Sequence, residues 1–316
     1  MGYGNYSNEA HAAIARSRAA APAEHVFKQV SCHPLMDPKG VKLRENRDSD
    51  AHPSSLGIVF ALDVTGSMGA IPDLLARREL PRFMKVLEDC KVRDPQLLFC
   101  AVGDATSDAA PLQVGQFEST AELMDQWLVW SYLEGGGGGS GQESYELAMY
   151  FMAVHTEMDC WTRRGKRGYL FMTGDELPYP KLSRHIVEKV VGDHLDDDLT
   201  AEEIVAELQI TFAPFFIIPD AERARRCERR WRDLLGDHVI VTERPEDICY
   251  VAAGAVSLRE GAVPDLDALS RVLVTAGAGR DEVSRAVRAL RPFAESGTPA
   301  AAIQTLGLAI RRLFKK

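Results

Sequence analysis

The sequence lacks several features that would each assign the protein to a broad class. No apolar run approaches the ~20 residues that a membrane-spanning helix needs, and the N-terminus has neither the charged nor the apolar region of a signal peptide. The six cysteines show no C-x-x-C spacing, and several fall in apolar runs where reduced, buried thiols are expected. These absences predict a cytoplasmic protein without a membrane partner.

An excess of positive charge is also absent. The 316 residues carry a net charge of −9, which makes a nucleic-acid partner unlikely to be held through phosphates unless basic residues gather on one face. The Walker motif G-x-x-x-x-G-K-[ST] does not occur, so ATP hydrolysis is not expected. The glycine run at 135–141 formally contains G-x-G-x-x-G, but no strand-like segment leads into it, which argues against NAD binding.

What the sequence does contain is a repeated alternation of strand-like and helix-like segments. Short apolar runs predict buried strands at 57–62, 96–102, 168–172, 215–218 and 238–241, with an edge strand at 112–117. Helix-like patterns occupy the intervals, among them 71–89, 144–157 and 221–235. This order predicts an α/β fold, a doubly wound and mostly parallel sheet flanked by helices.

Two segments flank the alternating region. Residues 1–55 begin with an Ala-rich helix capped by Ser7 and continue as turn-rich chain, which we interpret as an N-terminal helix and arm. Residues 262–316 read as two or three amphipathic helices and form a C-terminal helical extension. The α/β domain itself is expected to span 56–261.

The most informative motif follows the first predicted strand. Asp63, Thr65 and Ser67 occupy alternate positions directly after the apolar run 57–62. They therefore place one carboxylate and two hydroxyls at the carboxyl edge of the sheet, which is where open α/β sheets bind ligands. Three hard oxygen donors on one tight turn suit Mg²⁺, with Mn²⁺ or Ca²⁺ as alternatives. We predict these three residues as metal ligands.

The stretch resembles the metal-ion-dependent adhesion site of von Willebrand factor A (vWA) domains, usually written Asp-x-Ser-x-Ser. Here threonine replaces the middle serine and keeps the hydroxyl. The resemblance covers roughly residues 56–260 and implies ligands from two further loops. Asp175, just behind the apolar run 169–172, matches the carboxylate of the third loop.

The second loop departs from the family pattern, which often reads Gly-Gly-x-Thr with the threonine as ligand. The glycine run at 135–139 resembles instead an intracellular bacterial subgroup related to the vWA domain attached to alpha-kinases. Ser144 or Glu143 then takes the place of the threonine, with Ser144 ranked slightly ahead and Ser140 third. Asp104, after the second strand, is expected to accept a hydrogen bond from a metal-bound water, outside the coordination shell.

The resemblance implies a non-enzymatic adaptor. A bound Mg²⁺ would keep one coordination position open for an Asp or Glu of a partner protein. Intracellular bacterial vWA proteins often work with AAA+ ATPases of the MoxR type, or with kinases and stress or conflict systems. Two alternatives stay open: a scaffold whose metal site is vestigial, and a hydrolase using Ser67, although nothing in the sequence places His155 or His185 near that serine.

The predicted helix 221–235 has an unusual concentration of arginine. It carries six arginines interleaved with Glu222 and Glu228, at positions 223, 225, 226, 229, 230 and 232. Two interpretations are open: a basic contact face for an acidic partner, or a charged outer helix with ion pairs one turn apart.

Overall fold

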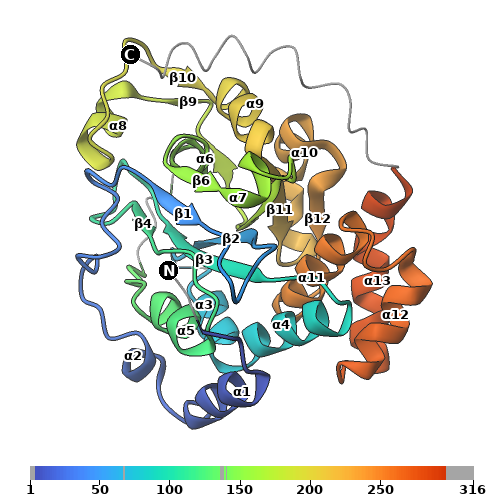
Figure 1. The fold of residues 1–316 in the computed structure, drawn as a ribbon. Coiled ribbons are helices and arrows are strands. Elements are labelled where there is room, and N and C mark those ends of the chain that lie inside the picture. Colours follow the sequence, from blue (N-terminus) through green and yellow to red (C-terminus); the bar gives the residue numbers. More distant parts are fainter. Residues whose placement is uncertain (1–3, 67, 136–138, 140, 297–316) are drawn as a thin grey trace.

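A six-stranded sheet forms the centre of the computed structural model, which describes residues 4–66, 68–135, 139 and 141–296 (Figure 1). All neighbouring strands are parallel except the edge pair β3–β4. In spatial order the strands are β12 (Val239–Val241), β11 (Phe212–Ile218), β7 (Gly168–Thr173), β2 (Leu56–Asp63), β3 (Pro95–Val102) and β4 (Leu112–Val114).

This order makes the sheet doubly wound. The chain starts in the middle with β2, proceeds to β3 and β4 on one side, then returns to β7 and continues to β11 and β12 on the other. The connections reverse direction between β2 and β7, and the carboxyl ends of such a pair enclose the ligand-binding crevice of open α/β sheets. The predicted fold class, including the edge strand near 112–117, is confirmed.

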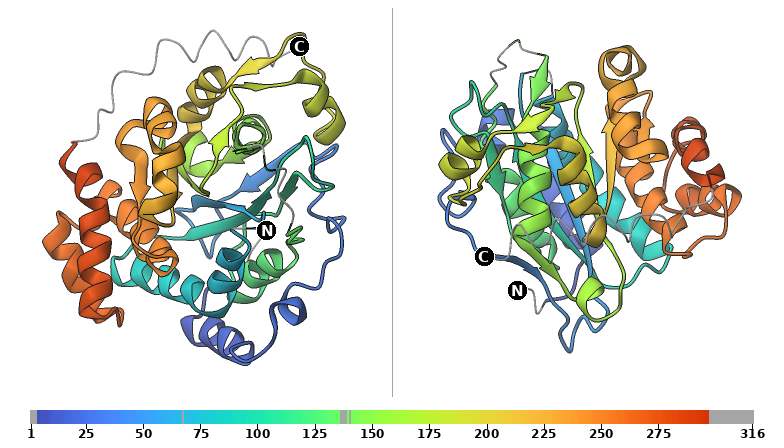
Figure 2. Two further views of the ribbon diagram at one scale, coloured as in Figure 1. Left: turned by 180° about the vertical axis from the view of Figure 1, so that it is seen from behind. Right: turned by 90° about the horizontal axis from the view of Figure 1, so that it is seen from above.

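Helices cover both faces of the sheet (Figures 1 and 2). On one face, α4 (Leu80–Asp89) packs against α11 (Ile248–Arg259). On the other, α9 (Ala201–Thr211) packs against both α6 (Tyr145–Val154) and α10 (Ala221–Leu235). The remaining elements are α2 (Ala23–Val26), α3 (Ala70–Leu74), a π-helical turn (Leu75–Glu79), α5 (Ala121–Val129), α7 (Asp159–Thr162), α8 (Arg184–Val190), β5 (Gln142–Glu143), β8 (Leu177–Pro178), β9 (Lys181–Leu182), β10 (Leu199–Thr200) and two 3₁₀ turns (Gly236–His238 and Pro245–Asp247).

A row of phenylalanines crosses the sheet and fixes its register. Phe60 of β2 lies opposite Phe99 of β3 and Phe171 of β7, and Phe171 lies opposite Phe215 of β11. The ring centroids of successive neighbours are 6.0, 5.6 and 5.1 Å apart, within the range of favourable aromatic packing. Phe83 of α4 covers the row, with its ring 5.0 Å from that of Phe60.

The N-terminal segment lies along the α/β domain. Its helix α1 (Asn8–Ser17) is capped by Ser7, as predicted, and packs against α4 and α5. Further on, β1 (Arg44–Asn46) forms a small parallel pair with β6 (Thr156–Met158). The helix predicted over 144–157 is therefore wrong at its end: α6 stops at Val154, because the next residues pair with a strand more than a hundred positions earlier in the chain.

The C-terminal helices extend the face formed by α4 and α11. Both α12 (Leu266–Thr275) and α13 (Arg280–Glu295) pack on α11 and on each other. Arg285 of α13 donates two hydrogen bonds, of 2.8 and 2.9 Å, to the buried carboxylate of Asp247 just before α11. Residues 297–316 lie outside the described part of the chain. Among the helices that are described, none is both long and apolar enough to span a membrane.

His155 connects the end of α6 to the arm and to the loop after α8. Its Nε2 lies 2.6 Å from Asp193 Oδ2, and its Nδ1 lies 3.0 Å from the Lys42 carbonyl oxygen. Burial lowers the pKa of His155, but the hydrogen bond and charge of Asp193 outweigh this and leave the pKa raised above 6.5. The protonated pair therefore stabilises the fold fully below about pH 6.5, and this contribution is lost as the pH rises through the folded-state pKa.

We expect His155→Gln to lower the free energy of unfolding by about 1–2 kcal/mol more at pH 5.5 than at pH 8.5, because only the acidic condition has the full charge pair to lose. Urea unfolding at the two pH values measures the difference. His185→Gln, at an exposed position of α8, is the matched control and should change the free energy of unfolding by less than about 0.5 kcal/mol. An equal loss for His155→Gln at both pH values would contradict the charged pair.

Candidate metal centre

The first loop folds around Asp63. This residue ends β2 and is fully buried. Its Oδ1 accepts hydrogen bonds from the backbone N–H of Thr65 at 2.9 Å and from the Thr65 hydroxyl at 2.6 Å. The Thr65 proton is thus committed to Asp63, which leaves the lone pairs of this hydroxyl available to a cation. Ser67, the third predicted ligand of this loop, lies outside the described residues.

Tyr145 holds the other oxygen of Asp63. Its hydroxyl donates to Asp63 Oδ2 at 2.6 Å, and its fully buried ring packs edge-on against Phe216 and Trp231. Among the described residues, Thr65 and Tyr145 thus donate three hydrogen bonds to the Asp63 carboxylate. The tyrosine fixes the orientation of this carboxylate.

The second loop brings a carboxylate that has no hydrogen-bond partner for one oxygen. Gly141, with a positive φ of 72°, leads into β5, and β5 pairs in parallel with β8 behind the third loop. Glu143 of β5 is only 3% exposed, and its Oε2 is buried without a partner among the described residues. Burying a carboxylate oxygen without a partner lowers the free energy of unfolding unless a cation or a proton binds to it.

Ser144, which was ranked slightly ahead of Glu143 as ligand, is engaged differently. Its Oγ accepts a hydrogen bond of 2.9 Å from the backbone N–H of Ala105, and its own N–H donates to the Gly103 carbonyl oxygen at 3.2 Å. Both bonds fasten the second loop to the chain that follows β3. Ser140, the third candidate, lies outside the described residues.

The third loop places Asp175 two residues after the end of β7, on the far side of the switch point from Asp63. Asp175 is buried and accepts a hydrogen bond of 2.9 Å from the Arg223 guanidinium of α10. The same guanidinium nitrogen lies 3.2 Å from the sulfur of Met68 in the first loop. An arginine thus contacts the first and third loops together.

Asp104 forms a second turn of the same kind at the end of the neighbouring strand. Its Oδ1 accepts from the backbone N–H of Thr106 at 2.9 Å, and the Thr106 hydroxyl reaches both carboxylate oxygens. Tyr179, after β8, donates to Oδ1 at 3.0 Å. Asp104 therefore organises its own loop, while its charge contributes to the potential at Glu143.

The carboxyl edge is short of positive charge. Burial is the main cause that raises the pKa of Asp63 to about 6, with Asp175 adding to it. Burial, followed by the charges of Asp63, Asp108, Asp104 and Glu176, raises the pKa of Glu143 to about 9. A divalent cation would relieve this repulsion, and the donor set of carboxylates and hydroxyls is the chemistry that Mg²⁺ prefers. The residues present therefore fit a hard metal ion.

Carboxylates alone do not build this centre. Within the described ranges, no group of three or more His, Cys, Asp or Glu side chains is arranged to hold a metal. A centre here depends on the hydroxyls of the first loop as well. Sequence reasoning missed Tyr145 and Arg223 as site residues. Tyr145 sits in a run of apolar helix residues, and Arg223 is one of six similar arginines in α10, so neither carried a local signal.

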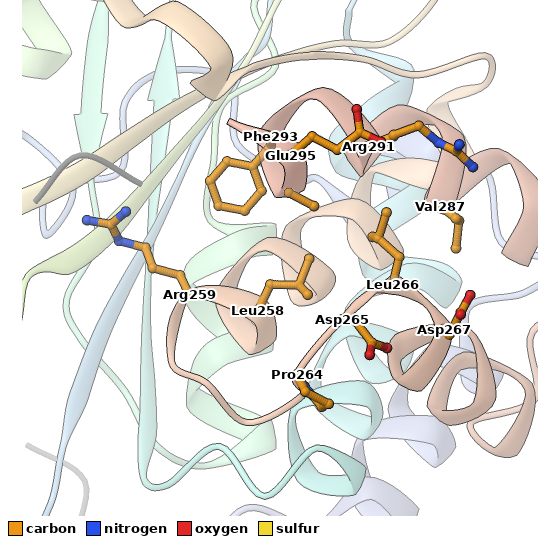
Figure 3. Close-up of a pocket in the computed structure, with 11 residues that line it drawn as sticks. Leu258, Arg259, Pro264, Asp265, Leu266, Asp267, Val287, Arg291, Phe293 and Glu295 are labelled. Atoms are coloured by element: carbon orange, nitrogen blue, oxygen red, sulfur yellow. The ribbon is translucent and has the colours of Figure 1, made fainter. Parts of the chain in front are cut away.

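A shallow hollow of about 490 Å³ lies away from this edge, between the ends of α11, α12 and α13 (Figure 3). Its described lining has no hydroxyl, thiol or imidazole side chain and combines Leu258, Leu266 and Phe293 with charged residues at the rim. Its carboxylates, Asp265, Asp267 and Glu295, are not brought together by loops at the carboxyl edge of the sheet, so the switch point remains the candidate site.

The chain matches no protein-family model and no curated protein. Solved structures with a similar course of the chain include the pilus adhesin SpaC of Lactobacillus rhamnosus GG in its open conformation, with 9% identity, a TM-score of 0.42, and coverage of 72% of this chain and 31% of the adhesin. Proximal thread matrix protein 1 of the mussel byssus has 8% identity and a TM-score of 0.37, covering 66% of this chain and 47% of that protein.

A third solved structure is a von Willebrand factor type A protein from Catenulispora acidiphila. It has 11% identity and a TM-score of 0.37, and the match covers 65% of this chain and 42% of that one. This chain therefore spans less than half the length of each of these three proteins. At these identities and TM-scores the matches carry no argument about family or function.

We expect Gly174→Ala to lower the free energy of unfolding by about 2–3 kcal/mol. A Cβ at position 174 would lie 2.0 Å from the Tyr145 hydroxyl oxygen, and the buried tyrosine has no room to retreat. Gly69→Ala is the control, because its Cβ would meet nothing closer than 3.8 Å. Denaturant unfolding of both variants tests the packing. Equal free energies of unfolding for Gly174→Ala and Gly69→Ala would show that Tyr145 does not pack tightly against Gly174 of the third loop.

Proposed function

We propose that this chain is a protein-binding domain of the vWA type that acts through a bound Mg²⁺ ion. One observation carries the proposal: three loops from both sides of the switch point bring Asp63, Asp175 and Glu143, whose Oε2 has no hydrogen-bond partner among the described residues, to one edge of the sheet. Asp63 is oriented by Thr65 and Tyr145. This is the edge at which doubly wound sheets bind ligands.

In this proposal Asp63, Thr65 and Ser67 hold the ion from the first loop, with Glu143 or Ser144 from the second and Asp175 from the third. We favour Glu143 over Ser144, because Ser144 Oγ already accepts from Ala105 whereas Glu143 Oε2 has no partner in the described chain. When bound, the metal offers an open coordination position to a carboxylate oxygen. Mn²⁺ and Ca²⁺ are alternative occupants of the same oxygen donors.

The partner that fits this chemistry is a protein that presents an Asp or Glu side chain. The resemblance of residues 63–67 to vWA domains supports a non-enzymatic, cytoplasmic adaptor, with an AAA+ ATPase of the MoxR type as the candidate partner. Catalysis by Ser67 has less support, because His155 is held by Asp193 and Lys42. His185 is exposed on α8.

A scaffold with a vestigial metal site is the second candidate. One observation favours it: Asp175 already pairs with Arg223 at 2.9 Å, so a cation of the protein itself occupies one expected ligand.

Affinity purification with the tagged full chain from its native cell tests the main proposal. We expect a partner that is retained in Mg²⁺ and lost both in EDTA and with Asp63→Ala, because removing the Asp63 carboxylate removes a central metal ligand. Asp197→Ala, at an exposed position, is the control and should retain the partner. If the same partners are recovered in every sample, the carboxyl edge with the metal centre is not the interface.

Calorimetric titration with Mg²⁺ distinguishes Glu143 from Ser144 as the ligand of the second loop. We expect Glu143→Gln to weaken Mg²⁺ binding by about tenfold or more, because it removes a buried carboxylate oxygen that is a candidate ligand of the ion. Ser144→Ala should change the affinity by less than about threefold and instead destabilise the chain by about 1 kcal/mol, because the Ala105 N–H loses its acceptor. The reverse ranking would make Ser144 the ligand.

A further inference from the structure

Arg223 is the basic side chain that pairs with a carboxylate of the candidate metal centre. Its Nη1 lies 2.9 Å from Asp175 Oδ2, and its Nε lies 2.8 Å from Asp220 Oδ2 at the start of α10. Within the described chain, Asp63 and Glu143 form no ion pair with a basic side chain. Arg223 therefore supplies positive charge directly to Asp175, at the edge that also holds these two carboxyl groups.

A metal ion at this edge and the Arg223 guanidinium place two cations close to one buried carboxylate. Their mutual repulsion is weakly screened, because Asp175 has only 7% of its side chain exposed. Metal binding therefore has to displace the guanidinium or overcome its charge.

The surroundings of Arg223 allow displacement. Its side chain is 32% exposed, so it can turn towards solvent without repacking the core. Asp220 is an alternative acceptor that is already in contact, and its Oδ1 also accepts the backbone N–H of Arg223 at 2.8 Å, which keeps the first turn of α10 capped. The guanidinium can leave Asp175 while the helix start stays in place.

We propose that Arg223 is a displaceable counter-cation of the metal centre. It holds Asp175 while no metal is bound, and it moves to Asp220 and solvent when a divalent cation occupies the edge. This inference rests on the proposed metal function and deepens it: Arg223 sets the metal affinity, and its release couples metal binding to the contact with Met68 in the first loop. The Arg223–Asp175 pair, which supports the alternative of a vestigial metal site, is then the metal-free state of a functional metal centre.

The test is calorimetric titration of the full chain with MgCl₂ at low ionic strength, comparing wild type with Arg223→Gln. Removal of the competing charge should tighten Mg²⁺ binding by about tenfold, and added salt should reduce the difference. The same variant should melt at a lower temperature than wild type in EDTA, because Asp175 has lost its ion pair with Arg223, and should recover in Mg²⁺.

Arg229→Gln is the matched control. It removes the same charge from an exposed position of the same helix, six residues further along, and should leave the affinity nearly unchanged. Asp175→Asn supplies a second test, because in that background Arg223→Gln should have no larger effect than Arg229→Gln. If Arg223→Gln folds poorly, Arg223→Lys serves instead: it keeps the charge but cannot bridge Asp175 and Asp220 at once, so it should tighten binding by a smaller factor.

The outcomes separate the two proposals. If wild type binds Mg²⁺ and Arg223→Gln binds it equally or more weakly, the counter-cation proposal is overturned. Arg223 then has only a structural role in positioning Asp175, and the proposed metal function stands. Binding by Arg223→Gln but not by wild type supports the counter-cation and overturns Mg²⁺-dependent action of the native chain. Binding by neither protein overturns both.

Discussion

The row of phenylalanines across the sheet is the constraint on which the rest of the structure depends. Phe99, Phe60, Phe171 and Phe215 occupy the same level of four neighbouring strands and point to the face covered by α4. Side chains alternate along a strand, so Asp63, three residues after Phe60, points to the opposite face, where Tyr145 of α6 reaches it. A slip of one residue would turn every side chain of β2 over and bury Asp63 against α4. Packing in the core thereby sets the position of the site.

Burial of carboxylates and the repulsion between them dominate the electrostatics of the candidate site. Strand ends and tight turns collect acidic residues because their side chains accept backbone N–H groups, as Asp63 and Asp104 do with Thr65 and Thr106. Burial of these turns beside Glu143 then creates a repulsion that hydrogen bonds only partly offset, which the raised pKa values of Asp63 and Glu143 express. The fold can tolerate such an edge when protons, a metal ion or an arginine supply the missing positive charge. Protons and a metal ion would compete for Asp63 and Glu143, whereas the arginine and a metal ion would compete for Asp175.

The sequence predicted the features that depend on local pattern. The apolar run before Asp63, the edge strand near 112–117 and the whole of α10 follow from periodicity, capping and turn residues that lie within a few positions of each other. The failures involve distant partners. Residues 156–158 read as the end of a helix because nothing nearby reveals their pairing with β1. The helix expected over 71–89 contains a π turn before Pro81, whose missing N–H breaks the regular hydrogen-bond ladder. The Tyr145–Asp63 and Arg223–Asp175 bonds join residues that only the sheet order brings together.

Under the proposed function, the distribution of charge around the edge favours one direction of approach for an acidic partner. On the β3 side, the loop that follows the strand carries Asp104 and Asp108, whose charges add to that of Glu143. On the β11 side, α10 starts at the edge and exposes Arg225 and Arg226 within its first two turns, and the charge of Arg226 reaches Glu176 beside Asp175. A carboxylate arriving over α10 meets attraction first, whereas one arriving over β3 meets repulsion. Under the proposed function, the exposed arginines of α10 and the metal centre would form a single recognition surface, in which the arginines attract an acidic segment and the metal binds its carboxylate.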